Sequence, residues 1–168
     1  MAKVVIMRGL PGTGKSTYVQ ERLGRLDAVC SADDYPGLYD DSFNIDFSKL
    51  SDAHDDCFRR FSELCERASS PDPLVSGAID TIYVDNTNTT LAEMAPYRMV
   101  ARRHKITVEF VAIYVPWTNR DGQKTQMEML EERNIHNVPA HTIRNMAKRW
   151  ENLPTFWGLE SFVQSKVD

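Results

Sequence analysis

The segment from Gly9 to Ser16 constrains the fold of this chain more than any other part of the sequence. It matches the pattern G-x-x-x-x-G-K-[ST], in which a glycine-rich turn precedes a lysine and a hydroxyl residue. The pattern lies between an apolar run, Val4 to Met7, and a stretch with helical spacing, Thr17 to Leu23, that Gly24 ends. A strand, a phosphate-binding turn and a helix in this order predict a P-loop at the edge of a parallel α/β sheet.

The residue types in this turn are suited to binding the phosphates of a nucleotide. Glycines let the backbone curl so that consecutive N–H groups point at phosphate oxygens, and the following helix adds its partial positive charge. In such a loop the lysine reaches the β- and γ-phosphates and the hydroxyl ligates Mg²⁺. A chance glycine-rich turn would produce the pattern in roughly one chain in 200 of this length. We therefore predict ATP and Mg²⁺ as cofactors, Ser16 as the metal ligand, and these nucleotide contacts: Gly9, Pro11, Gly12, Thr13, Gly14, Lys15, Ser16 and Thr17.

Predicted strands and helices alternate along the rest of the chain, which favours a parallel sheet covered on both faces. We predict a three-layer α/β/α sandwich with a mainly parallel sheet of four to five strands and a helical lid. Residues 1–168 are expected to form one domain, with the lid at about 119–139 and a C-terminal helix and tail at 140–168. The expected strands are 4–7, 28–30, 79–84 and 107–115, and the expected helices are 17–23, 47–68, 91–104, 123–133 and 140–150.

The composition limits the classes of partner. A net charge of −4 and a pI of about 5.6 lack the positive excess of proteins that wrap duplex DNA, so a nucleic-acid contact is expected to be short and local. No apolar run approaches the ~20 residues that cross a bilayer, and the apolar start is too short for a signal peptide, which predicts a cytoplasmic protein. The three cysteines, Cys30, Cys57 and Cys65, lack the spacing of a zinc site and are expected to be buried thiols.

Two adjacent carboxylates, Asp33 and Asp34, follow the second predicted strand. They lie at the edge where an open α/β sheet holds its ligand, and a carboxylate there can accept the proton of a hydroxyl that attacks the γ-phosphoryl group. Neighbouring residues that leave a strand point in different directions, so we expect only one to face the site. We favour Asp33 as the catalytic base and place Asp34 near the acceptor. The alternative is that both residues cap the next turn.

The third predicted strand ends in Asp85 and Asn86, which form a second group of candidates. P-loop proteins often place a residue near the metal or the acceptor at this position, and we assign both to acceptor binding. A polar strand exit is also common in other α/β domains. Alternatively, Thr89 or Thr90 simply caps the following helix.

The predicted lid contains candidates for charge stabilisation. Phosphoryl transfer spreads negative charge over the equatorial oxygens, and a mobile arginine commonly contacts them. Arg133, at the end of the 123–133 helix, is the candidate for this role, and His136 is expected to face the same phosphates. The alternative for Arg133 is an exposed side chain that interacts with the helix dipole. Trp117 is expected in the core rather than as a platform for stacked bases.

These segments together resemble the polynucleotide 5′-hydroxyl kinases, especially the kinase module of the phage enzyme that also carries a 3′-phosphatase domain. The likeness rests on residues 9–17, Asp33-Asp34-Tyr35, Asp85-Asn86-Thr87-Asn88 and Val115-Pro116-Trp117-Thr118, and extends to Arg133-Asn134, Val138-Pro139 and the tail 153–158. It spans nearly the whole chain. Part of the pattern is also similar to the kinase-like domain of a ubiquitin-ligase-binding protein.

The resemblance implies a P-loop kinase domain that transfers the γ-phosphoryl group of ATP to a hydroxyl acceptor. Lys15 and Ser16 would hold ATP and metal, and Asp33 would be the general base for a 5′-hydroxyl. Arg133 would act from the lid, and Asn86, at the family's strand-exit carboxylate position, would face the acceptor. The implied partner is the 5′ end of a short RNA or DNA.

Three departures from the family pattern concern the acceptor and the lid. Pro36 stands where the family has an acceptor-gripping arginine, Asn137 stands where it has a second lid arginine, and Asn86 replaces a carboxylate unless Asp85 substitutes for it. No phosphatase domain is expected after the tail. Three functions follow: a 5′-hydroxyl polynucleotide or oligonucleotide kinase, which we favour, a kinase of a nucleoside, modified base or other small metabolite, and a nucleotide-dependent binding or switch module.

Overall fold

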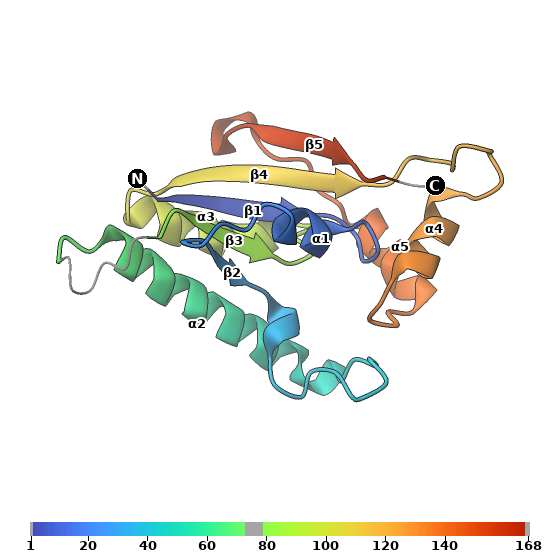
Figure 1. The fold of residues 1–168 in the computed structure, drawn as a ribbon, viewed down its shortest axis with the longest axis horizontal. Coiled ribbons are helices and arrows are strands. Elements are labelled where there is room, and N and C mark those ends of the chain that lie inside the picture. The colour runs from blue at the N-terminus through green and yellow to red at the C-terminus, as the bar shows by residue number, and fades with distance from the viewer. Residues whose placement is uncertain (1, 73–78, 167–168) are drawn as a thin grey trace.

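A five-stranded parallel sheet forms the centre of the computed structural model, which describes residues 2–72 and 79–166 (Figure 1). The strand order is β2-β3-β1-β4-β5, and each of these pairings is parallel. The predicted three-layer architecture and its parallel sheet are thereby confirmed. The ends of the predicted domain, residues 1 and 167–168, lie outside the described residues. The strands are β1 (Lys3–Arg8), β2 (Ala28–Cys30), β3 (Thr81–Asp85), β4 (Thr107–Tyr114) and β5 (Glu160–Gln164).

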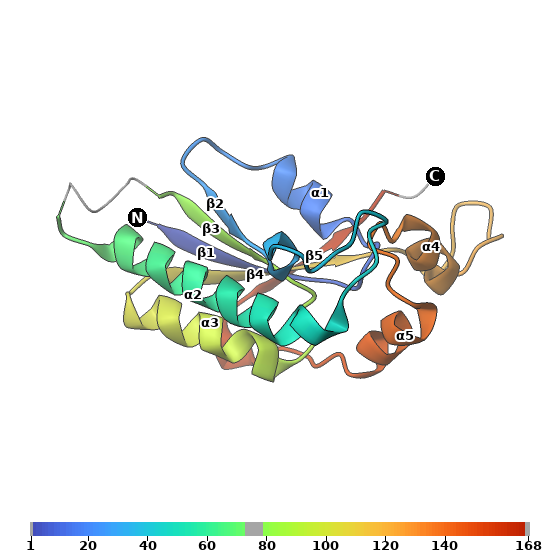
Figure 2. The same cartoon turned by 90° about the horizontal axis from the view of Figure 1, so that it is seen from below.

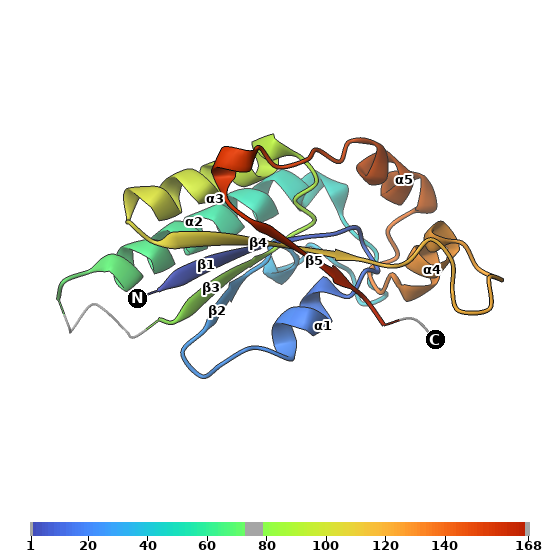
Figure 3. The same cartoon turned by 90° about the horizontal axis from the view of Figure 1, so that it is seen from above.

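Helices cover both faces of the sheet (Figures 2 and 3). α2 (Leu50–Ser69) and α3 (Leu91–Arg103) lie on one face, and α1 (Lys15–Gln20) lies on the other. Side chains of a strand alternate between faces, so Val4 and Ile6 pack in the core under α2 and α3, while their neighbours in β1 pack in a second core on the α1 side. Because both faces are covered, β1 is apolar without interruption from Val4 to Met7.

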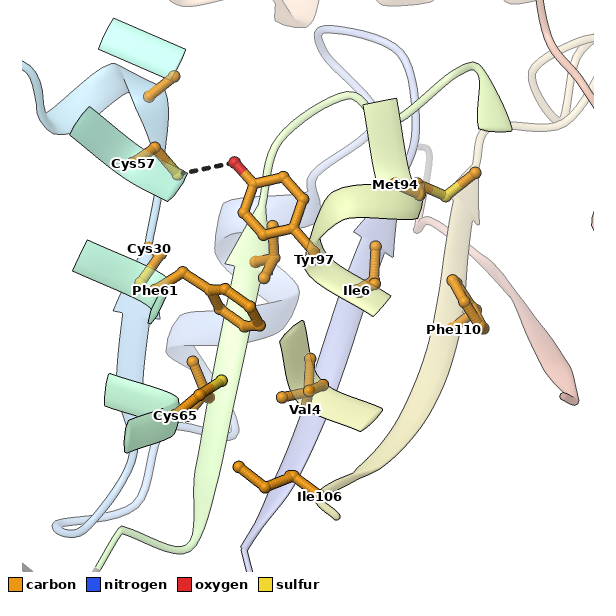
Figure 4. Close-up of a cluster of buried hydrophobic side chains, with 14 of the residues drawn as sticks. Val4, Ile6, Cys30, Cys57, Phe61, Cys65, Met94, Tyr97, Ile106 and Phe110 are labelled. Carbon is orange, nitrogen blue, oxygen red and sulfur yellow. Dashed lines mark hydrogen bonds between the residues drawn. The ribbon is translucent and has the colours of Figure 1, made fainter. Parts of the chain in front are cut away.

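The longest helix, α2, is amphipathic and buries one stripe of side chains against the sheet. Its buried residues follow helical spacing: Ala53, Cys57, Phe61 and Cys65. Figure 4 shows this cluster, in which the Tyr97 hydroxyl of α3 donates to the Cys57 sulfur at 3.4 Å. All three cysteines are buried, as predicted, and burial raises the pKa of Cys30 and Cys65 to about 12. In the described parts of the chain, no helix has both the length and the apolar character to span a membrane.

Several helix boundaries differ from the predicted ones, and capping decides two of them. α1 begins at Lys15, earlier than predicted, because Gly14 is its N-cap in a left-handed conformation with φ of 91°. The predicted 123–133 helix begins only at Gln126 as α4 (Gln126–Arg133), because Thr125 and Glu128 form a capping box.

The C-terminal third of the chain differs most from the prediction. After α5 (Ala140–Lys148) and the short helix η3 (Thr155–Trp157), the predicted tail returns to the sheet as the edge strand β5. β5 lacks the apolar pattern of a central strand, since it pairs on one side only and Phe162 is 65% exposed. The predicted lid corresponds to α4 and the turn that follows it, and Leu10 of the P-loop packs against this region through a core of Val115, Leu130 and Ile143.

The prediction that Trp117 lies in the core is wrong, because 83% of this residue is exposed. The chain leaves the sheet after β4, and the Trp117 carbonyl accepts a hydrogen bond from the Gln126 backbone N–H at 2.7 Å. This contact closes the loop before α4. The loop lies beyond the edge of the sheet, so no layer of the described fold covers the indole ring.

Candidate active site

The strand order brings three loops with candidate residues to one edge of the sheet. β3 lies between β2 and β1, and all three strands run in the same direction (Figure 3). The P-loop after β1, Asp85 at the end of β3 and Asp33 after β2 therefore lie at neighbouring carboxyl ends. This is the position at which parallel α/β sheets hold their ligands.

The P-loop is held by its own hydrogen bonds and by its neighbours. The Gly9 N–H donates to the Thr87 carbonyl at 3.0 Å, and the Thr13 hydroxyl donates to the Leu10 carbonyl at 2.9 Å. Lys15 Nζ donates to the same Leu10 carbonyl at 3.3 Å. Burial lowers the pKa of the Lys15 ammonium, while the carboxylates of Asp85 and Asp33 oppose this shift. A phosphate bound in the loop would supply the negative charge that this buried ammonium requires.

Gly12 is the residue of the P-loop that lies against α4. It has a φ of 84°, and a Cβ at this position would lie 2.4 Å from the carbonyl oxygen of Leu130 in α4. A side chain is therefore excluded by backbone strain and by contact with another backbone.

We expect Gly12→Ala to destabilise the fold by about 1–3 kcal/mol and to weaken ATP binding, because α4 must move away from the loop. Gly122→Ala is the matched control: its φ of 67° carries a similar backbone cost, but no described heavy atom lies within 4 Å of its Cβ position. Thermal unfolding and calorimetric titration with ATP measure both effects. Equal losses of ATP affinity in the two variants would contradict the proposed close contact.

Ser16 and Asp85 form the central contact of the site. The Ser16 hydroxyl donates to Asp85 Oδ2 at 2.7 Å, which links the start of α1 to the end of β3. Asp85 Oδ1 is buried and has no hydrogen-bond partner among the described residues. Burial raises the pKa of Asp85, while Lys15 and the hydrogen bond from Ser16 oppose this shift. The unpartnered oxygen and its desolvated carboxylate favour a nearby cation.

This arrangement fits Mg²⁺ bound together with a nucleotide. Mg²⁺ in phosphate-transfer sites is held by one or two protein oxygens, by substrate phosphates and by water. Ser16 and Asp85 provide such oxygens. Within the described ranges there is no cluster of three or more His, Cys, Asp or Glu side chains that could hold a metal.

Asp33 lies in the short helix η1 (Ala32–Asp34), which is hydrogen-bonded to Asn86. The Asn86 side chain is buried, accepts a hydrogen bond from the Ala32 N–H at 2.9 Å and donates to the Cys57 sulfur at 3.5 Å. Both ends of its amide thus have partners within the fold. Asn86 thus links the end of β3 to the segment that carries Asp33, a contact that its position in the sequence did not indicate, and its predicted role in acceptor binding stays a prediction.

The two adjacent carboxylates point in different directions. Asp34 lies 3.5 Å from an Arg60 nitrogen of α2. The Asp33 carboxylate instead accepts a hydrogen bond from the Tyr39 hydroxyl at 2.6 Å and lies 3.6 Å from His136 Nε2. Asp33 therefore faces the lid and Asp34 faces α2.

The lid residues lie in two separate places. Arg133 donates to the Ser165 hydroxyl at 2.7 Å, and its Nη2 lies 3.5 Å from the position that a Cβ on Gly14 would take. Its guanidinium is therefore beside the P-loop. The contacts of the His136 ring are instead with Asp33 and with Tyr39, on which it stacks. Pro11 lies in the loop, and Thr17 lies exposed in the first turn of α1.

Comparison with known proteins places this site in a family. A family model described as an AAA domain matches residues 4–153. The chain belongs to this AAA domain family. Over 150 residues it is 30% identical to human NEDD4-binding protein 2, a match that covers 88% of this chain and 8% of that protein. The chain thus spans less than a tenth of the length of this curated relative.

Solved structures share the fold of this AAA domain. A gluconokinase from Sinorhizobium meliloti superimposes with a TM-score of 0.54 at 16% identity, covering 99% of this chain and 84% of that one. A protein from Chloroflexus aurantiacus has a TM-score of 0.61 at 15% identity, covering 97% and 88%. Kti12 from Chaetomium thermophilum, in complex with ADP-AlF3, has a TM-score of 0.51 at 12% identity, covering 96% and 88%. At these identities the likeness shows the fold alone.

The AAA domain also depends on a buried arginine that the sequence did not single out. Arg8, the last residue of β1, is fully buried and forms a 2.6 Å ion pair with Glu160 of β5. It also donates to the carbonyls of Glu151, at 2.6 Å, and Asn88, at 3.0 Å, and lies 4.2 Å from the centre of the Trp150 ring. These partners are distant in the sequence, so only the folded tail shows why an arginine precedes the P-loop.

Proposed function

We propose that this AAA domain transfers the γ-phosphoryl group of Mg²⁺-ATP to a hydroxyl acceptor. The observation that carries the proposal is the Ser16–Asp85 hydrogen bond of 2.7 Å at the P-loop, with Asp33 at the end of the adjacent strand. A P-loop with one carboxylate supports nucleotide binding. A second carboxylate, exposed on the acceptor side, supports transfer.

Each residue has a defined part in this reaction. The P-loop amides and Lys15 bind the triphosphate. Ser16 and Asp85 would hold Mg²⁺, which would supply positive charge to the phosphate oxygens. Asp33 accepts the proton of the acceptor hydroxyl. The acceptor oxygen attacks the γ-phosphorus in line with the oxygen of the departing ADP. Arg133 is close enough to the P-loop to contact the charge that develops on the transferred group.

We expect Asp85→Asn to raise the Mg²⁺ concentration needed for half-maximal ATP binding by about 10–100-fold. The amide keeps the shape and can still accept from Ser16, but it removes the negative charge that attracts the metal. Fluorescence titration with Mg²⁺ at constant ATP measures the change. Asp27→Asn is the control. Asp27 accepts a hydrogen bond from the Gly24 N–H in an exposed loop, so its substitution should leave the titration unchanged. An unaltered Mg²⁺ requirement in Asp85→Asn would exclude Asp85 from the metal site.

For the acceptor we propose the 5′-hydroxyl of a short oligonucleotide, RNA or DNA. Support comes from the resemblance of the segments around Asp33, Asp85 and Arg133 to polynucleotide 5′-hydroxyl kinases. The active-site edge is open on the acceptor side, because 45% of the Asp33 side chain is exposed. The 5′ end of an oligonucleotide can therefore approach the Asp33 carboxylate while the rest of the oligonucleotide stays outside the site.

A small metabolite is the second candidate acceptor, and the charge of the acceptor side favours it. Pro36 occupies the position of the family's phosphate-gripping arginine. The segment 33–46 around Pro36 is acidic, and although Arg60 pairs with Asp34 and Lys49 with Asp46, the remaining negative charge would repel a polyanion there. Its carboxylates are Asp33, Asp34, Asp40, Asp41 and Asp46.

A transfer assay with γ-labelled ATP separates the candidates. The panel contains 5′-hydroxyl RNA and DNA oligonucleotides, the same strands with a 5′-phosphate, nucleosides and sugars. Labelling of 5′-hydroxyl strands only supports the oligonucleotide acceptor. Labelling of nucleosides or sugars, but never of oligonucleotides, selects the small-acceptor kinase. ATP binding with no labelled product from the whole panel would overturn the proposed transfer and support a nucleotide-dependent binding module.

A further inference from the structure

Tyr39 is held in place by a short hairpin on the acceptor side of the site. The chain between η1 and η2 (Phe47–Lys49) folds back on itself, and Tyr39 pairs with Ile45 in an isolated antiparallel bridge. The Asp46 N–H donates to the carbonyl of Leu38 at 2.7 Å, and the Leu38 side chain is completely buried. The hairpin is therefore anchored in the core next to Tyr39.

The Tyr39 hydroxyl makes a short hydrogen bond to the proposed base. It donates to Asp33 Oδ1 at 2.6 Å. Burial, this hydrogen bond and the negative charge of Asp33 all raise the pKa of Tyr39, so the phenol stays protonated at neutral pH and remains a donor. A hydrogen bond to one carboxylate oxygen restricts rotation of the Asp33 side chain and leaves Oδ2 for another partner.

The lid reaches the same two residues from the other side. The His136 ring stacks on Tyr39 with centroids 4.4 Å apart and an angle of 24° between the rings, and its Nε2 lies 3.6 Å from Asp33 Oδ2. The next residue, Asn137, donates from its side chain to the Ser42 carbonyl of the hairpin at 2.9 Å. The lid and the hairpin thus meet beside Asp33, whose side chain stays 45% exposed.

We infer that Tyr39 and His136 are positioning residues that couple closure of the lid to the orientation of Asp33. This inference rests on the proposed phosphoryl transfer. Tyr39 holds Oδ1, and the stacked imidazole borders Oδ2, so the acceptor hydroxyl meets an oriented oxygen only when the lid lies on the hairpin. The Asp33 carboxylate is aligned when the two segments meet, and it stays open to the acceptor because 45% of its side chain is exposed.

Three substitutions separate the hydrogen bond from the stacking. Tyr39→Phe keeps the ring and removes the hydroxyl, Tyr39→Leu removes both, and His136→Phe keeps an aromatic ring on Tyr39 but removes the imidazole nitrogens. Tyr114→Phe, on the partly exposed end of β4, is the control for loss of a tyrosine hydroxyl. The readouts are kcat and KM for the acceptor found in the panel, KM for ATP, and hydrogen exchange of residues 134–138.

We expect Tyr39→Phe to lower kcat by about 10–100-fold, as for loss of a hydrogen bond to a charged group, with KM for ATP and the exchange of the lid unchanged. Tyr39→Leu should lower kcat at least as much and also speed exchange at 134–138 severalfold. His136→Phe should keep the slow exchange and lower kcat less than Tyr39→Phe does. Tyr114→Phe should match the wild type.

Two results would overturn the coupling in an active enzyme. One is an unchanged kcat in Tyr39→Phe, and the other is equal exchange at 134–138 in Tyr39→Leu and wild type. Failure of the proposed function itself is distinct, because wild-type protein would then bind ATP and label no acceptor. Hydrogen exchange would still test the contact between the lid and the hairpin in that case.

Discussion

Replacement of Asp33 by alanine is expected to lower phosphoryl transfer by about 10²–10⁴-fold, the usual contribution of a general base. The affinity for Mg²⁺-ATP should remain within about twofold of wild type, because Ser16, Asp85 and the P-loop amides are unchanged. Single-turnover transfer of labelled phosphate measures the first effect, and calorimetric titration with Mg²⁺-ATP measures the second.

Asp34→Ala provides the internal comparison for this prediction. The two carboxylates are adjacent, but Asp34 faces Arg60 of α2, so its loss should reduce transfer by no more than a few fold. A variant Asp33→Ala that transfers at the wild-type rate would remove Asp33 from the mechanism. A large loss in Asp34→Ala with little loss in Asp33→Ala would assign the base to the neighbouring carboxylate.

Replacement of Arg8 by methionine is expected to reduce the free energy of unfolding by about 3–5 kcal/mol. Methionine has a similar length but leaves the Glu160 carboxylate, which is only 10% exposed, without its partner. It also removes the donor to the carbonyls of Asn88 and Glu151. For a domain of this size the loss corresponds to a decrease in Tm of roughly 6–20 °C, which calorimetry measures directly.

Lys3→Met is the matched control, because it removes a cation from the other end of the same strand. Lys3 pairs with Glu109 at 3.2 Å, but the two side chains are 42% and 54% exposed, so the expected loss is below about 1 kcal/mol. The double variant Arg8→Met with Glu160→Gln should recover part of the stability, because the amide leaves no uncompensated buried charge. Equal stability of Arg8→Met and Lys3→Met would show that the ion pair with Glu160 does not hold the C-terminal strand.

Much of the fold follows from local patterns. The apolar run of β1, the glycine-rich turn and the helical spacing of α2 and α3 predict a covered parallel sheet, because each pattern is a property of adjacent residues. β5 was not predicted, since an exposed edge strand with Phe162 on the outside lacks a strong period. The exposed position of Trp117 depends on how the chain leaves β4, which is not a local property either.

The sequence by itself determined that a P-loop follows the first strand and that carboxylates follow the next two strands of the sheet, because spacing and strand polarity place such residues at one edge. Only the tertiary structure decided which side chains each of them contacts. The strand order places Asp85 against Ser16, the hairpin turns Tyr39 towards Asp33, and the fold of the tail supplies Glu160 to Arg8. Each of these contacts joins segments that pack together through burial of distant apolar residues, so no local pattern of the chain contains it.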